Sequence, residues 1–76
     1  MKTFIKQIKT ADSKKALDSI ILEAFYSPNI NESQYDKLLS YTTCREIELG
    51  IWDYINHYPN KESALEEVQK EFKIKY

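Results

Sequence analysis

The 76-residue chain is poor in the residue types on which most enzyme motifs depend. It has one cysteine, Cys44, and one histidine, His57. A single cysteine excludes an intramolecular disulfide and a cysteine-based zinc site within one chain. Because these two residues lie on different sides of one expected helix, they cannot form a nucleophile and base pair. We therefore expect no catalytic residues, no metal site and no cofactor.

Glycine and long apolar runs are equally scarce. Gly50 is the only glycine, and neither a phosphate-binding loop nor a dinucleotide fingerprint can be built from one. The pattern places Gly50 in mid-helix, where close approach of a neighbour explains it. The longest apolar stretch, 16–26, is interrupted by charged residues and falls short of the roughly 18 residues of a membrane span. The lysines near the start do not suit a secretory signal. We expect a cytoplasmic protein with no membrane partner.

The overall composition is that of one folded domain. Hydrophobic residues make up 42% of the chain and charged residues 30%, with a net charge of −1. A chain of this length has room for one modest core, so we expect a single helical domain over residues 1–76. Its ten lysines against one arginine are a residue choice that AT-rich codons favour. This bias indicates a small protein of a low-GC bacterium or phage.

Helical periodicity runs through the whole chain, and no segment alternates like a strand. Five capping positions divide it: Thr3, Asp12 or Ser13, Asn31 with Gln34, Thr43 with Glu46, and Asn60. The segments that we expect to be helical are therefore 3–9, 14–26, 32–42, 44–58 and 61–76. The predicted fold class is all-α, a compact bundle of four main helices plus a short N-terminal helix.

Each expected helix has an apolar stripe that should face the core. The third has Tyr35, Leu38, Leu39 and Thr42, and the last has Leu65, Val68, Phe72 and Tyr76. The stripe of the second helix comprises Leu17, Ile20, Ile21, Ala24 and Phe25. The stripe of the fourth comprises Cys44, Ile47, Ile51, Tyr54, Ile55 and Tyr58.

The chain resembles the small YozE-type proteins in the spacing of a few residues, which are Phe4 near the start, Tyr35, Leu38 and Tyr41 in the middle, and Ala64 with Leu65. This resemblance implies a helical fold similar to that of sterile alpha motif domains. The chain lacks that group's Phe-Pro before the central tyrosine and the tryptophan of its last helix, so we assign no family.

Charge is distributed unevenly along the chain. Residues 16–67 contain ten acidic side chains against three basic ones, whereas residues 1–15 have a net charge of +4. The basic residues of this first segment could contact nucleic acid phosphates. They are Lys2, Lys6, Lys9, Lys14 and Lys15. A further alternative is that the acidic middle imitates nucleic acid and so inhibits a protein that handles it.

The fourth expected helix has an outer face that the core does not need. Leu49 is expected to point outward beside Trp52, with an acidic surround and a nearby glycine. An aromatic anchor within a charged rim is typical of a protein-binding patch. The patch consists of Glu46, Leu49, Trp52, Asp53 and His57.

The leading hypothesis is a non-catalytic binding module that acts stoichiometrically on a protein partner. A regulator, an immunity protein or an inhibitor encoded by a phage or mobile element fits this description. A homo-oligomer remains an alternative.

Overall fold

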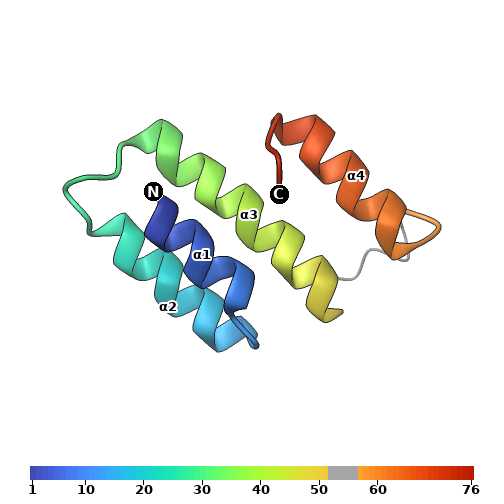
Figure 1. Ribbon diagram of the computed structural model, residues 1–76, viewed down its shortest axis with the longest axis horizontal. Helices are drawn as coiled ribbons and strands as arrows, with labels where there is room; N and C mark the ends of the chain where they lie inside the picture. Colours follow the sequence, from blue (N-terminus) through green and yellow to red (C-terminus); the bar gives the residue numbers. More distant parts are fainter. Residues whose placement is uncertain (52–56) are drawn as a thin grey trace.

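A computed structural model of the chain describes residues 1–51 and 57–76 (Figure 1). Helix α1 begins with Met1 as N-cap, so Thr3 lies inside it and is not the predicted cap. The described part of the chain contains no strand, which confirms the all-α prediction. Its four helices are α1 (Lys2–Thr10), α2 (Lys14–Phe25), α3 (Glu32–Leu49) and α4 (Lys61–Phe72).

Three helices begin where a polar side chain caps the free backbone amides, as predicted. The Ser13 hydroxyl accepts a hydrogen bond from the amide three residues on, at 3.1 Å. Asn31 accepts from the Gln34 amide at 2.8 Å, and the Gln34 side chain accepts from the Asn31 amide at 3.0 Å. Asn60 accepts from the amide three residues on at 2.8 Å. These caps satisfy amides that have no partner within the helix.

The helix boundary predicted at Thr43 is wrong, because α3 continues through it as one helix of 18 residues. The Thr43 hydroxyl donates to the Leu39 carbonyl at 3.1 Å, and Thr42 donates to the same carbonyl at 2.6 Å. Hydroxyls that bond back to the preceding turn are typical of threonines within a helix, not of N-caps. The predicted capping box with Glu46 is therefore absent.

Two stripes of buried or half-buried residues on α3 explain why its sequence looked like two helices. Leu38 and Leu49 contact the core formed with α1 and α2, whereas Cys44 and Ile47 pack against Ala64 and Val68 of α4. One stripe comprises Leu38, Thr42, Arg45 and Leu49, and the other comprises Ser40, Cys44 and Ile47. The second stripe is offset from the first by two residues. At about 100° per residue they lie on nearly opposite sides of α3. A helix packed on both sides has no single inner face.

Gly50 ends α3 and does not lie in mid-helix, contrary to the prediction. Its φ of 74° is left-handed, a conformation that glycine adopts without a Cβ clash. The Ile51 amide donates to the Glu46 carbonyl at 2.9 Å, which closes the helix end in a Schellman motif. Beyond Gly50 the predicted helix is wrong at Ile51, His57 and Tyr58, which are not helical, and residues 52–56 lie outside the described residues.

The helices form a flat arrangement with α3 in the middle (Figure 1). Helices α1 and α2 pack on one side of α3, and α4 packs against α3 alone among the described helices. The molecule measures 39 × 24 × 17 Å. Two separate clusters replace the single core of the predicted bundle: Ile8, Ala11, Leu17, Ala24 and Leu38 on one side, and Cys44, Ile47, Ala64 and Val68 on the other.

Several side chains predicted to face the core are exposed because none of the helices that the structure describes covers them. Phe25 is 62% exposed at the end of α2, and Phe72 is 49% exposed at the end of α4. Leu39 and Ile51 are 38% and 42% exposed. Leu39 lies between the two buried stripes of α3, and Ile51 follows the end of that helix. Uncovered apolar side chains of this kind are the first candidates for a contact surface.

Candidate functional site

The structure divides the patch that the sequence predicted for protein binding. Leu49 does not point outward, because it is partly buried against the cluster formed with α1 and α2. The Glu46 side chain is 17% exposed and binds the Lys14 ammonium at 3.2 Å. His57 is exposed. Trp52 and Asp53 lie outside the described residues. The protein-binding role of this patch stays a prediction, with Leu49 and Glu46 placed differently from what was expected.

The five lysines near the start are exposed but do not act as one free basic surface. Lys14 is held between Asp18 at 3.4 Å and Glu46 at 3.2 Å, and the hydrogen bond to Glu46 raises its pKa. The Lys9 ammonium lies 5.3 Å from the centre of the Tyr76 ring, in a cation–π contact. The lysines without such contacts on α1 and α2 are Lys2, Lys6 and Lys15.

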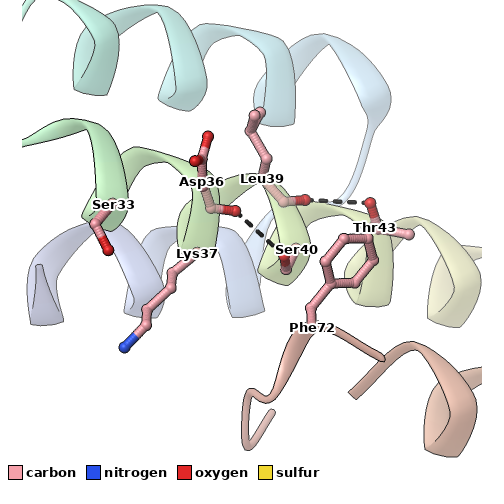
Figure 2. A pocket seen from close by; sticks show the side chains of 7 residues that line it. All are labelled: Ser33, Asp36, Lys37, Leu39, Ser40, Thr43 and Phe72. Atoms are coloured by element: carbon pink, nitrogen blue, oxygen red, sulfur yellow. Dashed lines mark hydrogen bonds between the residues drawn. The ribbon is translucent and has the colours of Figure 1, made fainter. Parts of the chain in front are cut away.

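A groove of about 540 Å³ lies beside α3 where α4 ends (Figure 2). Phe72, at the end of α4, lies over Ser40 and Thr43 in this view. The residues lining it are Ser33, Asp36, Lys37, Leu39, Ser40, Thr43 and Phe72. The groove marks the part of α3 that α4 is too short to cover.

The hydroxyl groups of this groove are used by the helix itself. Ser40 donates to the Asp36 carbonyl at 3.2 Å, and Thr43 donates to the Leu39 carbonyl at 3.1 Å. Both bonds appear as dashed lines in Figure 2, with the Asp36 carboxylate and the Lys37 ammonium pointing away from them. The groove therefore has no converging polar groups such as a small-molecule site needs.

The most exposed apolar side chains gather instead where α2 ends and α3 begins. Leu22, Phe25 and Tyr26 are 58%, 62% and 75% exposed. They lie together at the end of α2, where Tyr26 is the C-cap residue, because residues three and four apart are neighbours on a helix. The Phe25 ring meets the Tyr26 ring at 5.2 Å and the Tyr35 ring of α3 at 5.7 Å, both edge to face. We call Leu22, Phe25, Tyr26 and Tyr35 the aromatic corner.

A small cavity of about 190 Å³ opens within the aromatic corner. Two rings, those of Phe25 and Tyr35, line it together with the aliphatic side chain of Ile30. Glu32 is the only charged residue in its lining, and its carboxylate pairs with no other described residue. Asn31 also lines the cavity, with its side chain already engaged in capping α3.

The corner was missed because the sequence assigned Phe25 to the inner stripe of its helix. One signal was available, since Phe25 and Tyr26 are adjacent in sequence. Consecutive helical residues point about 100° apart, so two large rings next to each other cannot both be centred on one buried face.

A polar cluster beside α3 holds the C-terminal residues in place. Arg45 donates to the Ala11 carbonyl at 2.8 Å and binds the Glu48 carboxylate at 3.3 Å. The Tyr76 hydroxyl donates to the same carboxylate. Burial, together with this bond, raises the pKa of Tyr76. Each of these groups has a protein partner, which indicates that the cluster stabilises the fold.

The cysteine is inaccessible. Cys44 is 0% exposed, and burial raises the pKa of its thiol to about 11. At neutral pH the group is therefore a thiol and not the nucleophilic thiolate. Within residues 1–51 and 57–76, no three histidine, cysteine or carboxylate side chains converge as metal ligands.

None of the helices that the structure describes combines the length and hydropathy needed to cross a bilayer. No protein-family model matches the chain, and neither the curated proteins nor the solved structures contain a match to it.

Proposed function

We propose that the protein is a non-catalytic binding module that contacts a partner protein through the aromatic corner. The observation that supports the proposal is the exposure of Leu22, Phe25 and Tyr26, each more than half accessible at the C-terminal end of α2. Three adjacent large apolar side chains left in water form the kind of patch that marks an interaction site.

The composition of the corner also suits this role. Aromatic side chains contribute large contact areas and dominate the binding energy of many interfaces. Tyrosine adds a hydroxyl that can donate at the rim of a contact. The edge-to-face packing of Phe25 on Tyr26 and Tyr35 limits the freedom of these rings. Less conformational entropy is then lost when a partner binds.

Site-specific photocrosslinking in the native cell tests the proposal. A benzoylphenylalanine is introduced at one position at a time: at 26 in the corner, at 57 in the patch predicted from sequence, and at 67 on the exposed side of α4. We expect position 26 to give an adduct of defined mass with one protein, and position 67 to give none.

A second substitution controls for chance proximity. Adding Phe25→Ser to the variant with the crosslinker at 26 should remove the adduct, while Phe72→Ser, which changes a phenylalanine that is 49% exposed at the end of α4, should leave it. Circular dichroism checks that both variants fold. If position 26 gives no more adduct than position 67, the proposal is wrong. An adduct from position 57 alone would place the partner at the His57 patch instead.

A further inference from the structure

The cavity of the aromatic corner combines two features that together select for a positively charged ligand. Phe25 and Tyr35 supply aromatic rings, 5.7 Å apart between centroids and inclined at 67°. In this edge-to-face pair the edge of one ring covers a face of the other, and a ring face that the contact leaves free attracts a cation through its quadrupole. Glu32 adds a full negative charge to the same lining.

No lining residue opposes a cation. The other lining residues are Ala24, Ile30 and Asn31, which carry no charge, and the Glu32 carboxylate has no ion-pair partner in the described part of the chain. The C-terminal end of α2 and the N-terminal end of α3 both border the cavity, so their helix dipoles oppose each other and Glu32 supplies the net negative charge.

We propose that this cavity binds an alkylammonium group, which a partner protein supplies as a lysine side chain, best in its N-methylated form. The inference rests on the proposed function, because it names the group that the partner inserts into the aromatic corner. Methyl groups spread the charge and weaken hydration, so less free energy is lost when the cation leaves water for an apolar lining. The cavity of about 190 Å³ has room for such a head group.

The first test compares two probes of nearly equal shape: choline, which carries a trimethylammonium, and 3,3-dimethyl-1-butanol, its neutral isostere. Each is titrated into the ¹⁵N-labelled protein. We expect choline to shift the amide signals of Phe25, Ile30, Glu32 and Tyr35, with a dissociation constant about fivefold or more below that of the alcohol.

Variants separate the ring faces from simple apolar contact. Phe25→Leu keeps an apolar wall but removes one π-face, so choline should lose its advantage while the alcohol binds as before. Glu32→Gln should weaken choline binding and leave the alcohol unchanged. Phe72→Leu, outside the corner, should change neither. Equal affinities of the two probes for the unaltered protein, or choline shifts mapping elsewhere, overturn the inference.

A second arm identifies the source of the cation. We expect a peptide with trimethyllysine to bind more tightly than the same peptide with lysine, and Phe25→Leu to remove the difference. Preferential binding to phosphatidylcholine vesicles would overturn the assignment to a protein partner. If the probes show no charge preference while the Phe25-dependent adduct at position 26 persists, the cation inference fails and the proposed function stands.

Discussion

At the scale of single residues, two positions adopt the same left-handed conformation with different side chains. Gly50 ends α3 with φ of 74°, and Lys73 ends α4 with φ of 54°. In both cases the amide of the next residue donates to a helix carbonyl: Ile51 to the Glu46 carbonyl at 2.9 Å, and Ile74 to the Gln69 carbonyl at 3.0 Å. Glycine meets no penalty there, whereas lysine places a Cβ near a carbonyl oxygen.

Opposite effects on stability are therefore expected at these two helix ends. Gly50→Ala should lower the free energy of unfolding by about 1 kcal/mol, since a Cβ there meets no atom within 4 Å and only backbone strain opposes it. Lys73→Gly should raise it by about 0.5–1 kcal/mol. Urea titrations followed by circular dichroism measure both. If both substitutions changed the free energy of unfolding in the same direction, the left-handed backbone would not be what determines stability at both helix ends.

The buried thiol of Cys44 makes stability depend on alkaline pH. Burial raises its pKa from 9.0 to about 11, so the native state retains a proton that the unfolded chain releases. The contribution is complete below pH 9 and is lost as pH rises from 9 to 11. Unfolding free energies at pH 8, 9 and 10 should fall, and Cys44→Ala should flatten the change. An equal slope in the variant would contradict this assignment. Tyr76, whose pKa is also raised, adds to this loss of stability only above pH 10, because its own contribution is complete below that pH.

At the scale of elements, local signals predicted some helix ends and failed at others. The caps at Ser13, Asn31 and Asn60 were predictable, because a cap bonds an amide only three residues away. The continuity of α3 was not, because it depends on helices packing from both sides. The aromatic corner was missed for a related reason, since exposure of Phe25 depends on which neighbours are absent and not on its own helix.

Two alanine substitutions in α3 distinguish one long helix from two. Asn31→Ala should lower the free energy of unfolding by about 1 kcal/mol, because it removes a capping box. Thr43→Ala should be neutral or slightly stabilising, because alanine has the higher helix propensity in a helix interior. Chemical denaturation of both variants provides the comparison. A loss of about 1 kcal/mol for Thr43→Ala would mean that a second helix begins there.

At the scale of the whole molecule, α3 connects two clusters that do not share a core. Ile8 and Val68, buried at 0% and 3% exposure, belong to opposite sides of it. Helix α4 packs only against α3 among the described helices, and the segment after it contacts α1 through Lys9 and Tyr76, so we expect α4 to open with little effect on α1 and α2.

Native-state hydrogen exchange should reveal this asymmetry. Val68→Ala should lower the opening free energy of α4 amides by about 1–2 kcal/mol and change those of α1 and α2 less. Ile8→Ala, in the other cluster, should affect α1 and α2 more than α4. Equal changes in all helices would indicate a single cooperative unit.

The central claim is that the aromatic corner is the contact surface of a binding module. Its most direct test is the dissociation constant of the partner captured at position 26, measured with the purified protein, Phe25→Ser and Phe72→Ser. We predict that Phe25→Ser weakens binding about thirtyfold or more, the loss expected of an aromatic anchor, and that Phe72→Ser leaves it unchanged. Unchanged affinity for Phe25→Ser, or a loss confined to Phe72→Ser, would contradict the claim and move the contact away from the corner.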